Sequence, residues 1–130
     1  MKDEISIQIL NTDAANRNTA YNIQCKKLKA QAIENIGSAM YYEHKGIDTL
    51  RTALKLWDET GDKQGMASAY LRIAELFTAQ GNNANALKYC DTSLNLYTQA
   101  NDKNKMGYIY YKIALNHRYM GNYGMLWKTI

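Results

Sequence analysis

The sequence contains no proline, and this absence decides much of what the chain can form. Proline breaks helices because it lacks a backbone N–H and its ring clashes with the preceding turn. Without it, every segment is free to form a long helix, and 46% of the 130 residues are apolar. A chain of this length buries roughly two thirds of its unfolded surface in one domain. We therefore predict an all-α fold and a single domain over residues 1–130.

Side chains that commonly carry catalysis or bind metals are scarce. The two cysteines, Cys25 and Cys90, lie far apart without metal or redox spacing, and we expect both to be reduced, buried thiols. His44 and His117 are the only histidines, and neither has a partner at metal-ligand or triad spacing. There is no glycine-rich phosphate-binding loop. We expect no enzymatic activity, no metal and no cofactor.

Acidic residues are missing from the C-terminal part of a mildly basic chain. The net charge is +4, and after Asp102 only basic residues carry charge: Lys103, Lys105, Lys112, Arg118 and Lys128. Such a surface suits an acidic partner, but the charge is too small for a nucleic-acid interface. The first residues carry acids where a signal peptide has bases, and their apolar run is short. We expect no membrane insertion and a cytoplasmic location.

A repeat with a spacing of 40 residues organises what is present. Self-similarity at this period is typical of solenoids, in which each unit buries its apolar face against the next. The matches are Asp62-Lys63 with Asp102-Lys103, Met66 with Met106, Tyr70 with Tyr110, Ile73-Ala74 with Ile113-Ala114, and Gly81-Asn82 with Gly121-Asn122.

The repeat divides the chain into units, each expected to be a pair of antiparallel helices. We expect units at 23–61 and 62–101, a truncated unit at 102–130, and a partial N-terminal helix at 1–22. Residues 4–15 are predicted to be a second helix, because Ile7, Leu10 and Ala14 precede Ile47, Leu50 and Leu54 by one period. The Asn-rich stretch that follows favours a helix break near 16–22, and a further helix is expected at 23–44.

The central unit resembles the tetratricopeptide repeat family, in its long variant of about 40 residues. The resemblance implies a right-handed superhelix of antiparallel helical hairpins, whose first helices line a concave groove that binds peptides. In the first unit Gly37 stands at the position of Phe77, which leaves the register open, and Gly46 is an alternative equivalent of Gly81. The residues that carry the resemblance are Ile73-Ala74, Phe77, Gly81, Ala86-Leu87, Ser93-Leu94 and the connector from Thr60 to Gly65.

The resemblance also implies which residues line the groove. Tyrosine offers contact area at low entropic cost, and arginine and lysine bind carboxylates, a mixture enriched at binding hot spots. We therefore expect a scaffold or sensor module that binds an acidic peptide or a partner helix. The implied groove residues are Ser68, Leu71, Arg72, Glu75 and Thr78, one period later Tyr108, Tyr111, Lys112, Leu115, Arg118 and Tyr119, and one period earlier Gln31 and Asn35.

Two alternatives stay open at this point. The groove residues could instead pack against a following helix pair or lie in solvent. The chain could also be a self-associating structural module, a homodimer formed through its terminal helices with Leu126, Trp127 and Ile130 in the contact.

Overall fold

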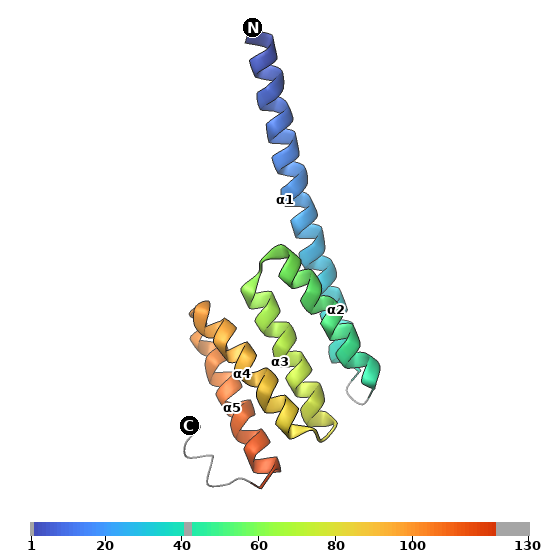
Figure 1. Cartoon of the computed structure of the whole chain (residues 1–130), viewed down its shortest axis with the longest axis vertical. Helices are drawn as coiled ribbons and strands as arrows, with labels where there is room; N and C mark the ends of the chain where they lie inside the picture. Colours follow the sequence, from blue (N-terminus) through green and yellow to red (C-terminus); the bar gives the residue numbers. More distant parts are fainter. Residues whose placement is uncertain (1, 41–42, 122–130) are drawn as a thin grey trace.

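The computed structural model describes residues 2–40 and 43–121, and helices follow one another through these ranges (Figure 1). Each helix packs on its neighbour in the sequence, and α1 also contacts α3. The prediction of an all-α fold is confirmed. The helices are α1 (Lys2–Ser38), α2 (His44–Thr60), α3 (Lys63–Ala79), α4 (Asn83–Gln99) and α5 (Lys103–Tyr119).

A residue with a positive φ angle ends each of the helices α2 to α5. These residues are Gly61, Gly81, Asn101 and Gly121, at intervals of 20 residues, with φ angles of 71°, 80°, 56° and 76°. Glycine and asparagine adopt this left-handed conformation at least cost, which is why they end helices so often. Each period of 40 residues therefore contains two turns, and both have a residue with a positive φ angle.

Each of these turns is followed by a side chain that caps the next helix. The carboxylates of Asp62 and Asp102 and the amide oxygen of Asn82 accept hydrogen bonds from the backbone N–H three residues later. The donor–acceptor distances are 2.9, 3.2 and 3.3 Å for Asp62, Asp102 and Asn82. A cap of this kind satisfies one of the N–H groups that a helix leaves unpaired at its start.

Removal of the cap at Asp62 gives a direct measure of what it contributes. We expect Asp62→Ala to lower the free energy of unfolding by about 1 kcal/mol, because the N–H of Gly65 loses its acceptor. Asp62 also forms an ion pair with Lys27 at 3.3 Å, so Asp62→Asn, which keeps an acceptor but removes the charge, is the matched control. Urea denaturation followed by circular dichroism measures both. An equal loss in the two variants would assign the effect to the ion pair.

Small residues let the helices approach closely. A Cβ atom on Gly46 would lie 2.6 Å from the Met40 carbonyl oxygen and 3.1 Å from the Leu76 side chain. One core cluster joins Ile47 and Leu50 of α2 with Ile73 and Leu76 of α3. A second joins α3, α4 and α5 around Ala67, Leu71, Ala74, Cys90, Tyr97, Ile109 and Ile113.

The position of Gly46 also settles the register of the first unit. Gly46 is buried inside α2 against Leu76, and it is not among the glycines with a positive φ angle. It corresponds to the buried Ala86 of α4, one period later, and not to the turn residue Gly81.

The N-terminal part of the chain differs from the prediction. No break occurs near 16–22, because α1 runs without interruption from Lys2 to Ser38. The residue 40 positions before Gly61 is Tyr21. A tyrosine in the left-handed conformation costs about 1–2 kcal/mol. Continuation of the helix avoids this cost. The helix expected at 23–44 is therefore the C-terminal half of α1, and it ends at Ser38.

Two expectations about single side chains are also wrong. Cys90 is buried, but Cys25 is exposed, because it lies on a side of α1 that none of the helices α2 to α5 covers. Tyr110, the repeat equivalent of the packing residue Tyr70, is 41% exposed, and the buried side of α5 is formed by Ile109 together with Ile113, the expected equivalent of Ile73.

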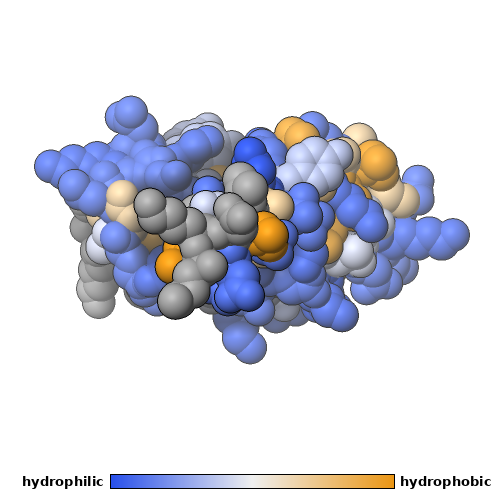
Figure 2. Space-filling view, turned by 90° about the horizontal axis from the view of Figure 1, so that it is seen from above, coloured by the Kyte–Doolittle hydropathy of each residue, from blue (hydrophilic) through white to orange (hydrophobic). Residues whose placement is uncertain are grey.

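The surface seen from the end at which α1 projects is mostly hydrophilic, with hydrophobic residues in separate spots (Figure 2). Among the described helices, none has a stretch both long and apolar enough to span a membrane.

Candidate functional site

Two pockets follow each other along the facing sides of α3 and α5, and we call them together the α3–α5 groove. The pocket nearer the helix N-termini has a volume of about 390 Å³, and the pocket nearer the C-termini about 240 Å³. The first is lined by Ser68, Leu71, Arg72, Asn104, Lys105 and Tyr108. The second is lined by Ala74, Glu75, Thr78, Ala79, Cys90, Lys112, Leu115, Asn116 and Tyr119.

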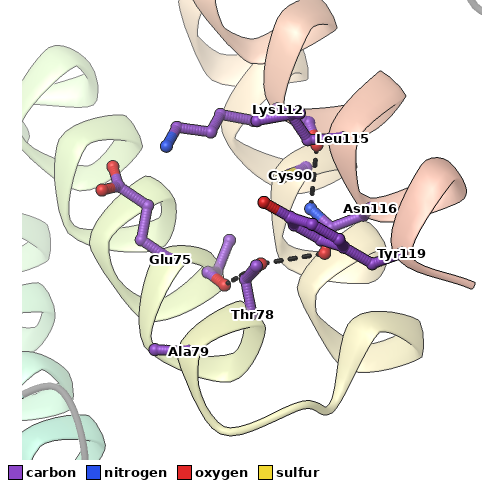
Figure 3. Close-up of a pocket in the computed structure, with 9 residues that line it drawn as sticks. Glu75, Thr78, Ala79, Cys90, Lys112, Leu115, Asn116 and Tyr119 are labelled. Atoms are coloured by element: carbon purple, nitrogen blue, oxygen red, sulfur yellow. Dashed lines mark hydrogen bonds between the residues drawn. The ribbon is translucent and has the colours of Figure 1, made fainter.

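Hydrogen bonds fix the floor of the second pocket (Figure 3). Asn116 is 1% exposed, and its amide nitrogen donates to the Lys112 carbonyl oxygen at 2.9 Å. Its amide oxygen accepts from the Thr78 hydroxyl at 2.8 Å, which joins α5 to α3. Because both polar ends of Asn116 are satisfied inside the chain, the pocket keeps its shape without a ligand.

Lys112 lines the second pocket and contacts Tyr108 of the first. Its ammonium lies 5.2 Å from the centre of the Tyr108 ring, within cation–π range, and it reaches toward Glu75 on the opposite wall (Figure 3). Partial burial by itself would lower the pKa of Lys112, but the Glu75 carboxylate and the Tyr108 hydroxyl outweigh it, and the net pKa is raised. Lys112 is therefore a permanent positive charge in the groove at neutral pH.

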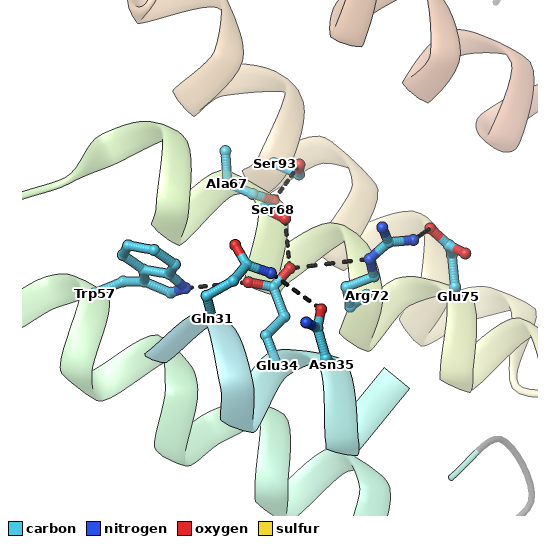
Figure 4. Close-up of polar contacts among 9 residues, drawn as sticks. All are labelled: Gln31, Glu34, Asn35, Trp57, Ala67, Ser68, Arg72, Glu75 and Ser93. Carbon is cyan, nitrogen blue, oxygen red and sulfur yellow. Dashed lines mark hydrogen bonds and ion pairs between the residues drawn. The ribbon is translucent and has the colours of Figure 1, made fainter. Parts of the chain in front are cut away.

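A buried carboxylate positions Arg72 on the wall of α3 (Figure 4). Glu34 of α1 is 2% exposed and accepts hydrogen bonds from Trp57 Nε1 at 3.1 Å and from the Ser68 hydroxyl. Arg72 Nε lies 3.9 Å from Glu34, and an Arg72 Nη atom lies 3.3 Å from Glu75. A buried carboxylate needs such partners to offset its lost hydration. The network therefore ties α1, α2 and α3 together and holds the guanidinium beside the groove.

Most of the groove residues expected from the sequence line one of the two pockets, but four do not. Gln31 and Asn35 are exposed on α1, bonded to each other at 3.0 Å, and line neither pocket. Tyr111 is 58% exposed and Arg118 is also exposed, and neither lines either of the two groove pockets. Leu71 borders the first pocket but is only 3% exposed and belongs mainly to the core. The role of all these residues in binding remains a prediction.

Sequence reasoning missed several residues of the groove. Lys105 and Asn104 continue the α5 stripe one turn toward its N-terminus, so helical periodicity could have found them. Asn116 and Glu34 gave no such signal, because a polar residue is buried only where tertiary neighbours supply its hydrogen bonds.

Cys90 borders the second pocket but is not an activated nucleophile. Burial, with smaller contributions from Asp91 and Glu75, raises the pKa of its thiol to about 12, although Lys112 opposes the shift. The thiol is therefore neutral at physiological pH, and the thiolate is the reactive form of cysteine. Across the described residues, no three His, Cys, Asp or Glu side chains gather in a group that could hold a metal ion.

Comparison with known proteins identifies the segment that carries the groove. Residues 65–125 match the family model of the tetratricopeptide repeat. No curated protein and no solved structure matches the chain significantly. The matched range begins in the first turn of α3 and includes the rest of α3, all of α4 and all of α5. Domains of this kind are generally protein-interaction modules and typically lack catalytic activity. Residues 65–125 therefore carry a tetratricopeptide repeat, set in a fold of sequentially packed helices.

Proposed function

We propose that this protein is a non-catalytic interaction module that binds an acidic peptide segment in the α3–α5 groove. The observation that carries the proposal is the charge of the lining. Arg72, Lys105 and Lys112 supply positive charge, whereas Glu75 is the one carboxylate among the residues that line the two pockets. Glu75 is paired with Arg72 and also attracts Lys112, so one carboxylate faces three cations and the lining keeps a positive excess that can attract a ligand.

The shape and chemistry of the groove support an extended or helical peptide. Two pockets in line along one helix pair can take successive side chains of one segment. Tyr108 and Tyr119 offer flat apolar area with a hydroxyl, and lysines near them can form charge-assisted bonds with carboxylates. Because these charges are partly exposed, attraction should weaken as the salt concentration rises.

The direct test compares two sets of fluorescent peptides that share the same apolar residues, one with Glu and Asp and the other with Lys and Arg. Fluorescence anisotropy should show saturable binding of acidic peptides to the purified chain, weaker at high salt, and no binding of the basic set. Equal binding of the two sets, or binding of neither, would overturn the proposal.

Removal of one groove charge should weaken this binding selectively. We expect Lys112→Gln to raise the Kd of an acidic peptide roughly tenfold, because a charge-assisted hydrogen bond is lost. Lys88→Gln is the matched control, since Lys88 is exposed on α4 and lines neither groove pocket. Unchanged thermal unfolding of both variants would confirm that the fold is intact. An equal effect of the two substitutions would mean non-specific attraction by net charge.

The alternative of self-association through Leu126, Trp127 and Ile130 concerns residues that lie outside the described ranges. It remains a prediction.

A further inference from the structure

One side of α1 carries apolar residues that none of the other described helices covers. The helix packs on the rest of the fold through Ala30, Glu34 and Gly37, which are buried. On the opposite side, a stripe follows the whole length of the helix at helical spacing, and we call it the α1 stripe. It comprises Ile7, Ala14, Tyr21, Cys25, Leu28 and Ile36, of which Ile7, Tyr21, Leu28 and Ile36 are 57%, 69%, 63% and 60% exposed.

The corresponding side of α3 is covered by the helix before it. Gly65 packs against the indole of Trp57, and Leu76 lies against Gly46, both contacts being made by α2. Cys25 and Ile36 hold the same positions in α1, one period earlier, and both are exposed. The α1 stripe is thus the surface on which a preceding second helix would pack.

The sequence of such a second helix is present in the same chain, at the far end of α1. Ile7, Leu10 and Ala14 precede Ile47, Leu50 and Leu54 of α2 by one period. This segment does not fold back on the α1 stripe, because α1 continues through Tyr21, and the N-terminal half of the helix projects beyond the other helices (Figure 1). An isolated helix of this length, with several asparagines, is only marginally stable in water.

We propose that two copies of the chain pair through α1 in antiparallel orientation, so that the N-terminal half of each α1 covers the α1 stripe of the other. The uncovered stripe and the unsupported half-helix then complete each other. The contact is isologous, because the same surface serves both copies, and it closes at two copies. The pairing is a domain swap, in which the N-terminal half of α1 acts as the second helix of the partner's repeat. With a turn at Tyr21 the same segment would fold back on its own chain, but α1 continues through Tyr21.

The contacts between α2 and α3 define the register of this pairing. Gly46 of α2 contacts Leu76 of α3, and the residues 40 positions earlier are Ser6 and Ile36. The pairing therefore places Ser6 of one copy against Ile36 of the other. In the same way, the contact between Trp57 and Gly65 becomes Arg17 facing Cys25. In each of these two pairs, the midpoint between the two residues along the sequence is Tyr21. A two-fold axis at Tyr21 is what an antiparallel pair of identical helices requires.

The same register brings complementary side chains together. It places the large Leu28 opposite the small Ala14, and it places Lys29 opposite Asp13. Lys29 and Asp13 are both exposed, and neither belongs to an ion pair among the described residues. The two-fold symmetry forms each of these contacts twice.

Charge reversal tests both the association and its register. Sedimentation velocity over a range of concentrations should show a dimer of the wild-type chain. Asp13→Lys and Lys29→Asp should each weaken the dimer about tenfold, since each change makes two repulsive pairs, and the double variant should recover most of the affinity. Asp91→Lys, at an exposed position of α4, is the control. A chain that stays monomeric at millimolar concentration, or a double variant weaker than both single ones, would overturn the proposal.

Cross-linking tests the orientation. In a Cys25→Ser background, Tyr21→Cys should form a disulfide between chains on mild oxidation, because the axis passes through this position. Ile23→Cys, on the other side of α1, should not form one. Leu28→Cys alone should stay uncrosslinked, whereas Ala14→Cys with Leu28→Cys should crosslink. A disulfide formed by Leu28→Cys alone would show parallel pairing and would contradict the antiparallel arrangement.

Discussion

Replacement of Trp57 by alanine is expected to lower the free energy of unfolding by about 3–5 kcal/mol. Trp57 is 7% exposed and packs between α1 and α3 in a cluster with Ala30 and Ala69. Its indole N–H is also a donor to the buried Glu34. The substitution therefore opens a cavity and removes one of the groups that offset burial of a carboxylate. Urea denaturation followed by circular dichroism measures the loss.

Trp57→Phe separates the two contributions. The phenyl ring keeps most of the packing, but it cannot donate to Glu34, so we expect a loss of about 1–3 kcal/mol. An alanine variant as stable as the phenylalanine variant would mean that packing of the ring contributes little. Such a result would contradict the assignment of Trp57 to the core.

Gly65→Ala is expected to destabilise the fold by about 1–3 kcal/mol, although alanine is the better helix former. Gly65 lies in the first turn of α3, and a Cβ atom there would overlap the Trp57 ring. The ring cannot move freely, because its N–H is held by Glu34. The gain in helix propensity, about 1 kcal/mol, is therefore smaller than the cost of overpacking.

Gly107→Ala is the matched control for this prediction. Gly107 also lies near the start of a helix, α5, but a Cβ atom there would have no neighbour within 4 Å among the described residues. We expect this variant to gain about 0.5–1 kcal/mol from helix propensity alone. The two glycines should thus give opposite signs in thermal or urea unfolding. Stabilisation by both substitutions would show that α2 and α3 can separate slightly at Trp57.

The repeat could be predicted well where a turn is determined by residues that are adjacent in the sequence. Gly61 and Gly81, each followed by a capping residue, specify where one helix ends and the next begins, and the structure has its turns at these positions. The prediction failed at Tyr21, because an Asn-rich stretch suggested a turn but the position 40 residues before Gly61 holds a tyrosine, which does not suit a positive φ angle. Composition alone favours a break there, whereas the backbone conformation of one residue decides against it.

The groove was predictable only in part, for a related reason. Helical spacing places Ser68, Arg72 and Lys112 on one side of their helices, and periodicity is a property of the sequence. It cannot show that Gln31 and Asn35 line neither pocket, because that depends on how α1 packs against α2 and α3.

The sequence by itself determined the helices of the repeat, their turns and their caps, because these depend on interactions between residues a few positions apart. The tertiary structure alone decided which polar residues are buried, with Glu34 and Asn116 as the clearest cases. It also decided that one side of α1 stays uncovered. Burial is set by neighbours distant in the chain, and a side chain becomes core, groove or free surface only when those neighbours are in place.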